Sequence, residues 1–157
     1  MISINLMNNK IIIVDLDGTL ALNKHRFHYI DKSLGKRIDW DAYFEACDQD
    51  IPHTPVIETI KALKAQGYKI HVFSARGDVV REKTIQWLNK HNVLFDDLTM
   101  REMNSYTPDE ELKKQWLLSY YPNYQVDIFC VFDDRDKVVK MWRSMGLTCF
   151  QVAEGDF

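Results

Sequence analysis

Short apolar runs and amphipathic segments alternate along the chain. The apolar runs are too short to cross a membrane, and their branched residues are typical of buried strands. Four of them are predicted to be strands, at residues 10–14, 68–73, 126–132 and 148–153, with a short strand or extended connection at 93–99.

Helices are predicted between these runs, where apolar residues recur at helical spacing between capping residues. They cover residues 54–66, 78–92, 107–121 and 135–145. The clearest start is Thr107-Pro108-Asp109-Glu110. Thr107 is expected to be the N-cap and Pro108 the first helical residue, and Glu110 completes a capping box.

Strands that alternate with helices predict an α/β fold, a Rossmann-like parallel sheet flanked by helices. A chain of 157 residues is long enough for one domain with a real core, so we expect a single domain over residues 1–157. Residues 22–53 interrupt the alternation and offer one short amphipathic helix, at 40–47. We expect this stretch to be a small cap inserted after the first strand.

Composition is that of an ordinary globular protein, with 46% hydrophobic and 27% charged residues and a net charge of −3. This charge argues against a protein that coats nucleic acid, but it is unevenly distributed. Residues 23–38 carry +4, and either a solvated loop or a surface that faces an anionic substrate explains them. The charged residues of this stretch are Lys24, Arg26, Asp31, Lys32, Lys36 and Arg37.

The three cysteines, Cys47, Cys130 and Cys149, share no short spacing. An odd number of unpaired cysteines in apolar surroundings predicts buried free thiols. No signal peptide or membrane span is recognisable, and together these features predict a cytoplasmic protein with no membrane partner.

Polar residues gather where the predicted strands end. They are Asp15 and Asp17 after the first strand, Ser74 and Arg76 after the second, and Asp133 and Asp134 after the fourth. Ligands of open parallel sheets bind beyond these carboxyl ends, so the residues are expected to meet at one edge. One aspartate there is an ordinary strand-end cap, but four carboxylates repel one another unless a hard cation binds them. Mg²⁺ is the expected cation, and it suits a phosphate substrate.

The same residues resemble the motifs of the haloacid dehalogenase (HAD) superfamily. These motifs are DLDGT after a buried strand, a serine after the second strand, a lysine on a later helix, and DD after the fourth strand. The resemblance covers nearly the whole chain from Ile11. The C-terminal run from Asp133 to Phe157 is similar to the phosphatase domain of bacteriophage polynucleotide kinase-phosphatases.

This resemblance implies a role for each catalytic residue. Asp15 is expected to be the nucleophile that takes the phosphoryl group as an aspartyl-phosphate. Asp17 is expected to protonate the leaving oxygen and then activate water, with a pKa raised by neighbouring carboxylates. Lys113 is expected to orient the nucleophile and stabilise developing charge.

The resemblance also implies binding residues. Thr19 and Ser74 are expected to hold phosphoryl oxygens. Arg76 is placed beside them, with a simple ion pair to Asp15 or Asp133 as an equal alternative. The expected Mg²⁺ ligands are Asp15, the backbone carbonyl of Asp17, Asp133 and Asp134.

The function predicted from these residues is that of a Mg²⁺-dependent phosphomonoesterase. Its substrate is expected to be a nucleic-acid 3′-phosphate or a nucleotide. Two alternatives stay open: a phosphatase of free nucleoside monophosphates or other small phosphometabolites, and a receiver-like phospho-switch without turnover. The sequence holds no G-x-x-x-x-G-K-[ST] motif, so a P-loop kinase is not expected in this chain.

Overall fold

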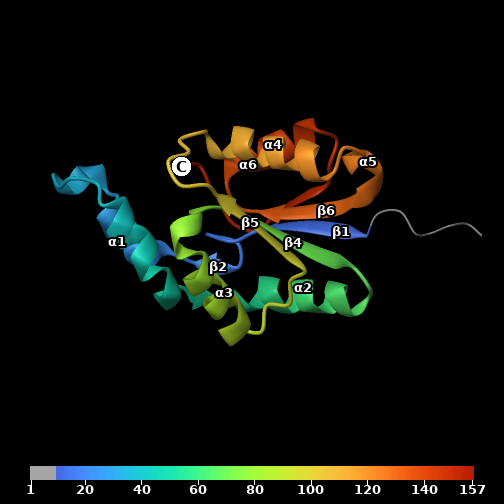
Figure 1. Ribbon diagram of the computed structural model, residues 1–157, viewed down its shortest axis with the longest axis horizontal. Helices are drawn as coiled ribbons and strands as arrows, with labels where there is room; N and C mark the ends of the chain where they lie inside the picture. The colour runs from blue at the N-terminus through green and yellow to red at the C-terminus, as the bar shows by residue number, and fades with distance from the viewer. Residues whose placement is uncertain (1–9) are drawn as a thin grey trace, which may run out of the picture.

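A five-stranded parallel sheet forms the centre of the computed structural model, which describes residues 10–157 (Figure 1). The order of the strands across the sheet is β5-β4-β1-β6-β7. Their bounds are β1 (Ile11–Asp15), β4 (Lys69–Gly77), β5 (Asp97–Arg101), β6 (Ile128–Asp133) and β7 (Cys149–Gln151). β1 lies in the middle, so Asp15 ends at the centre of the carboxyl edge.

Helices cover both faces of the sheet, as the alternating pattern predicts. One face carries α2 (Thr54–Ala65) and α3 (Arg81–Lys90). The other carries α4 (Asp109–Tyr120), α5 (Tyr124–Asp127) and α6 (Asp136–Ser144), drawn above the sheet in Figure 1. The predicted α/β fold with a flanked parallel sheet is therefore confirmed.

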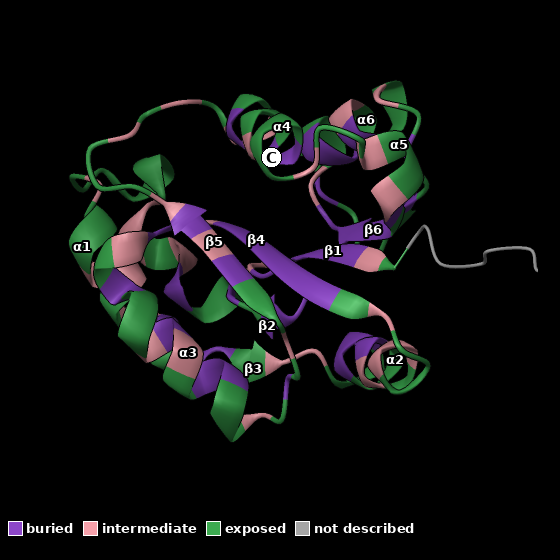
Figure 2. Cartoon of the chain, turned by 45° about the vertical axis from the view of Figure 1, so that its right-hand side comes forward, coloured by how far each residue is buried: buried purple, intermediate pink, exposed green. Residues whose placement is uncertain are grey.

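Successive residues of β1 pack into two different cores, since side chains of a strand alternate between its faces. Ile12 and Val14 pack with apolar residues of α2 and α3, among them Trp87. Ile13 packs on the other face with residues of α4 and α6, including Trp142. Figure 2 accordingly shows the central strands almost wholly buried, which holds the carboxyl edge in a fixed place.

A cap follows β1, as predicted, and we use this name for residues 23–50. It leaves and re-enters the core through β2 (Ala21–Leu22) and β3 (Ile51–Pro52), which pair antiparallel. The cap holds α1 (Trp40–Glu45) and three short 3-10 helices, η1 (Lys24–Tyr29), η2 (Lys32–Leu34) and η3 (Ala46–Gln49). Figure 1 shows it beyond the carboxyl end of the sheet. The sequence indicated only the one helix, because 3-10 turns leave no apolar periodicity.

Several element bounds differ from those predicted. β4 continues to Gly77, so Ser74 and Arg76 lie inside a strand and not after it. β5 begins at Asp97, four residues after the start of the apolar run at 93–99. The short helix α5 was not predicted. Thr107 is not an N-cap: α4 begins at Asp109 without a side-chain cap, and the Thr107 carbonyl accepts a hydrogen bond from Arg101 Nη1 at 2.7 Å.

The predicted buried thiols are confirmed, because Cys47, Cys130 and Cys149 are all free and buried. Within residues 10–157 the structure has no helix with the length and apolar character needed to span a bilayer.

Candidate active site

Lys113 links the ends of β1 and β6. From α4, its Nζ donates to Asp15 Oδ1 at 2.6 Å and to Asp133 Oδ2 at 2.9 Å. Thr19 Oγ1 donates to the other oxygen of Asp15, Oδ2, at 2.8 Å. All four of these residues are buried, so both oxygens of Asp15 are held in fixed directions.

Asp133 is fixed further by its own helix and turn. Trp142 Nε1 donates to Oδ2 at 3.1 Å, and the backbone amides of Asp134 and Arg135 donate to Oδ1 at 2.9 Å and 3.3 Å. A carboxylate that accepts from this many donors is held in one orientation. Asp133 therefore presents the same oxygens whether or not a ligand is present.

Asp15, Asp133 and Asp134 form a compact acidic group, with one carboxylate oxygen from each lying within 4.8 Å of the others. Burial raises the pKa of Asp15 well above its ordinary value, Lys113 opposes this shift, and Asp133 and Asp134 add to it. Burial and repulsion by Asp133 likewise raise the pKa of Asp134, to about 6. Three convergent carboxylates, whose charge Lys113 offsets only in part, are a donor set that suits a hard divalent cation such as Mg²⁺.

Gly18 lets the loop after β1 come close to Asp134. Its φ is +87°, and a Cβ at this position would lie 2.1 Å from Asp134 Oδ2. The DLDGT loop and the DD pair are thus packed against each other, which explains how two motifs more than a hundred residues apart share one site.

Asp17 faces a different environment from the one expected. Its carboxylate pairs with the guanidinium groups of Arg26 and Arg76, not with other carboxylates. Burial alone would raise the pKa of Asp17, but Arg76 and Arg26 outweigh it and hold this pKa below the usual range. The prediction that neighbouring acids raise the pKa of Asp17 is therefore wrong for the ligand-free site.

Arg76 does not pair with Asp15 or Asp133, the two partners the sequence suggested. Besides Asp17, its Nη2 donates to Asp50 Oδ2 at 3.0 Å and its Nη1 to Thr84 Oγ1 at 3.0 Å. The side chain is fully buried within these contacts. Arg76 is thus an ion-pair partner of Asp17, the second aspartate of the DLDGT motif.

Asp50 and Arg26 are part of the site that the sequence did not reveal. Asp50 is buried at the end of the cap and accepts from Arg26 Nε and Nη2, both at 2.8 Å. His25 Nε2 lies 2.8 Å from its Oδ1. Arg26 stood among the cations of 23–38 and Asp50 among the acids of a loop, and nothing in their spacing set them apart.

Ser74 lies on β4, two residues before Arg76. It is buried, and its Oγ accepts a hydrogen bond from the backbone amide of Arg76 at 3.2 Å. Its hydroxyl proton is free to be donated to an oxygen that enters the site.

Asp109 joins two arginines at the rim. Arg101 Nη2 donates to its Oδ1 and Arg135 Nη1 to its Oδ2, each at 2.6 Å. Arg101 also binds the Ala75, Ser105 and Thr107 carbonyls. The segment between β5 and α4 is held against the site in this way.

A parallel sheet with acids at the ends of β1 and β6, and a lysine from the intervening α4, is the architecture of a HAD-type phosphatase. A hydrolase from Streptococcus pneumoniae TIGR4 has the same fold, with a TM-score of 0.60 at 16% identity over 94% of this chain and 95% of that chain. The fold class is therefore established.

Within this class the chain belongs to the family of polynucleotide kinase PNKP phosphatase domains, whose model matches residues 9–157. A structure of the Pnkp1/Rnl/Hen1 RNA repair complex contains a similar chain, with a TM-score of 0.79 and 36% identity. The match covers 98% of this chain and 45% of that one.

A protein of Autographa californica nuclear polyhedrosis virus, assigned as a bifunctional polynucleotide kinase/RNA ligase, is 31% identical over 144 residues. These residues make up 90% of this chain and 19% of the viral protein. This chain thus spans less than half of the RNA repair protein and about a fifth of the viral one.

Proposed function

We propose that the chain is a Mg²⁺-dependent phosphomonoesterase that removes the 3′-phosphate from a nucleic-acid end through an aspartyl-phosphate on Asp15. The observation that carries this proposal is the placement of Asp15. It ends the central strand, both of its oxygens are fixed, and it lies beside two further acids and Lys113.

In the first step, an oxygen of Asp15 forms a bond to phosphorus while the bond from phosphorus to the 3′-oxygen breaks. Lys113 neutralises charge on Asp15 and keeps it pointed at the phosphorus atom. Thr19 lies 2.8 Å from Asp15 Oδ2, so its hydroxyl is within reach of a phosphoryl group on Asp15. Ser74 supplies a second hydroxyl.

Asp17 gives a proton to the leaving 3′-oxygen and, in the second step, takes one from the water that attacks phosphorus. Inorganic phosphate leaves, and Asp15 is restored as a carboxylate. The carboxylate form that Arg26 and Arg76 favour is the form needed in the second step. For the first step, the negative charge of the bound phosphoryl group would share these arginines and so raise the pKa of Asp17.

Asp15, Asp133, Asp134 and the backbone carbonyl of Asp17 would hold Mg²⁺, which supplies charge neutralisation for the phosphoryl oxygens when bound. The raised pKa values of Asp15 and Asp134 support this assignment, because these buried acids repel one another and a bound cation would relieve the repulsion. All of these donors are oxygens, as Mg²⁺ prefers.

Family membership supports a nucleic-acid end as the substrate, and so does the cap. Lys24, Lys32, Lys36 and Arg37 are exposed on it, whereas Arg26 is buried and used internally. Four exposed cations beyond the catalytic edge suit a leaving group that keeps further phosphates, as an oligonucleotide does.

The test is turnover of a 3′-phosphorylated oligonucleotide by Asp15→Asn, which keeps the shape of the side chain and removes the attacking charge. We expect activity to fall by several orders of magnitude with folding intact. Acid quenching of the wild-type protein with labelled substrate should trap protein-bound phosphate, and Asp15→Asn should trap none. Asp97→Asn is the matched control, since Asp97 is exposed at the amino end of β5.

Metal removal tests the cofactor separately. Chelation should abolish turnover, and Mg²⁺ should restore it. Ca²⁺ should restore little, because it is larger and does not impose the octahedral geometry of Mg²⁺. Activity that survives full chelation would contradict the magnesium assignment. A protein that takes up one phosphate and never releases it would be a switch, and faster turnover of free mononucleotides than of oligonucleotides would favour the small-substrate alternative.

A further inference from the structure

Two aromatic side chains meet across the gap between the cap and the core. Phe27, on η1 of the cap, and Phe157, the last described residue, have ring centroids 6.5 Å apart with planes inclined by 60°. Phe157 is 55% exposed and Phe27 is half-buried. The Phe157 ring is therefore exposed enough to stack against a ring of a bound molecule.

Both rings are tied to the acidic edge through their neighbours. Arg26, the residue before Phe27, contacts Asp17. On the other side, the Asp136 amide donates to the Gly155 carbonyl at 2.7 Å, and a Cβ on Gly155 would lie 2.2 Å from the Asp134 carbonyl oxygen. The segment that carries Phe157 is therefore packed directly against the backbone of Asp134.

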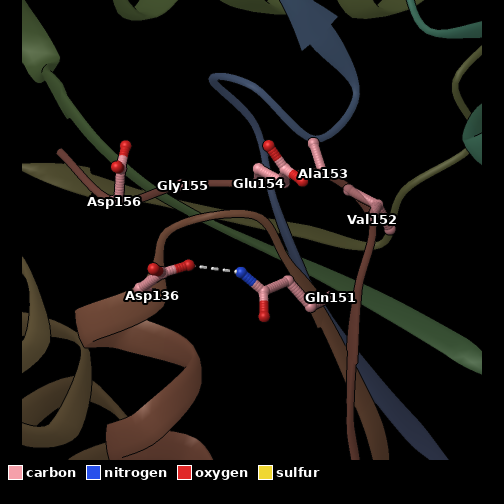
Figure 3. A pocket seen from close by; sticks show the side chains of 7 residues that line it. All are labelled: Asp136, Gln151, Val152, Ala153, Glu154, Gly155 and Asp156. Carbon is pink, nitrogen blue, oxygen red and sulfur yellow. Dashed lines mark hydrogen bonds between the residues drawn. The ribbon is translucent and has the colours of Figure 1, made fainter.

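This C-terminal segment is well held along its length. Gln151 Nε2 donates to Asp136 Oδ1 at 2.6 Å, a bond drawn in Figure 3, and to the Asp134 carbonyl at 3.0 Å. Figure 1 shows the C-terminal end at the carboxyl edge of the sheet, on the side where the cap lies. The segment that ends in Phe157 is thus held by contacts to the backbone of Asp134, one of the three clustered acids.

Arg135 supports Phe157 from the core. Its guanidinium carbon lies 5.4 Å from the centre of the Phe157 ring, and its Nε donates to the Phe157 carbonyl at 2.7 Å. Arg135 is itself oriented by Asp109. A ring with a fixed position and a cation against it is a good stacking surface for a nucleobase. Because every base has a π-face, such a surface accepts any of the four bases.

We infer that Phe157, with Phe27 beside it, stacks against the base of the nucleotide whose 3′-phosphate enters the site. This inference rests on the proposed action at nucleic-acid ends and adds a base subsite to it. The four cap cations recognise phosphates, which every position of a strand has. The aromatic pair would instead recognise that the terminal sugar carries a base.

Two oligonucleotides that differ at one position provide the test. Both carry a 3′-phosphate and the same number of phosphates, but the terminal sugar of the second is abasic. We expect the wild-type protein to prefer the base-bearing end through a lower KM, by about tenfold, the usual effect of one aromatic–base stack. Phe157→Ala should reduce this preference towards one, whereas Phe157→Tyr should retain it.

Phe129→Ala is the matched control, because Phe129 is 43% exposed but packs against the Tyr68 ring near the amino end of β6. It should keep the preference. Phe157→Leu keeps apolar volume without a π-face and should lose the preference as the alanine variant does. Its result stands even if Phe157→Ala does not fold.

An equal loss on both substrates would overturn the inference, because the two rings would then only join the cap to the core. A wild-type protein that turns over both oligonucleotides equally would overturn it as well. Absence of turnover on both would instead overturn the proposed function itself.

Discussion

Position 18 must be glycine for two separate reasons. Its φ of +87° is unfavourable for any residue with a Cβ, and that Cβ would overlap Asp134 Oδ2. We therefore expect Gly18→Ala to lose about 1–2 kcal/mol of stability from the backbone alone. Because Asp134 must also move, phosphatase activity should fall at least a hundredfold, measured on protein that is still folded.

Gly67→Ala separates the two reasons. Gly67 has a φ of +98°, yet nothing lies within 4 Å of its Cβ position. This variant should show the loss of stability in thermal unfolding with activity retained. If both variants lost the same small amount of activity, the contact between Gly18 and Asp134 would be of no catalytic consequence.

Some residues of the site could be predicted from the sequence, and others could not, for a physical reason. Asp15 and Asp133 end the buried strands β1 and β6, and Asp17 and Asp134 lie just beyond, so their position at one edge follows from the topology. Arg26 and Asp50 lie in irregular segments of the cap, where only three-dimensional contact reveals that they are buried. The ion pairs around Asp17 reverse the expected direction of its pKa for the same reason.

At the scale of elements, His71 joins β4 to its neighbours. Its Nδ1 lies 2.7 Å from the Tyr121 hydroxyl, which follows α4, and its Nε2 lies 2.7 Å from Thr99 Oγ1 of β5. Burial lowers the pKa of His71 to about 4, and Asp97 opposes the shift only in part. This histidine is therefore neutral near pH 7 and has a structural role.

A pH-dependent stability follows from His71. Between pH 6.5 and pH 4 the unfolded chain binds a proton that the folded chain does not, so the free energy of unfolding falls as the pH falls through this window. From pH 7 to pH 5 we expect His71 to account for a loss of roughly 1–2 kcal/mol. His71→Gln should remove this part of the slope in urea unfolding. An unchanged slope would show that other groups cause it.

Element positions followed from apolar periodicity where a continuous buried face exists. β1, β4 and β6 fill the middle of the sheet, and their runs of branched residues were sufficient to find them. α4 begins one residue later than predicted, because Arg101 engages the Thr107 carbonyl and Asp109, contacts that local capping rules do not include. The 3-10 helices of the cap were missed because they have no repeating apolar face.

At the scale of the whole molecule, the cations of residues 23–38 form a basic stretch at the start of the cap, in a chain whose net charge is −3. If the exposed cap cations bind the strand that leads to the 3′-end, reversing Lys36 and Arg37 to Glu should raise KM for a 3′-phosphorylated oligonucleotide. A small aryl phosphate, which reaches only the catalytic edge, should be much less affected. Each lost phosphate contact should also flatten the slope of log K against log salt by about 0.7.

The same reversal at Lys90 and Lys140, both exposed and outside the cap, is the matched control. It changes the net charge equally and should leave the salt slope largely as in the wild-type protein. Equal effects of the two double variants would mean that overall charge, and not the cap surface, governs binding.

The chain enters and leaves the cap through the two-residue strands β2 and β3, so at first sight the cap is an exchangeable module. A different insertion could be joined at the same two points without disturbing the central sheet. Yet Arg26 and Asp50 would leave with the old cap, and Asp17 would lose one arginine while Arg76 would lose its second carboxylate. If Asp17 transfers protons and the cap selects the substrate, as proposed, the two properties would be inherited together, and a grafted cap would need its own pair of these residues to redirect the enzyme to another substrate.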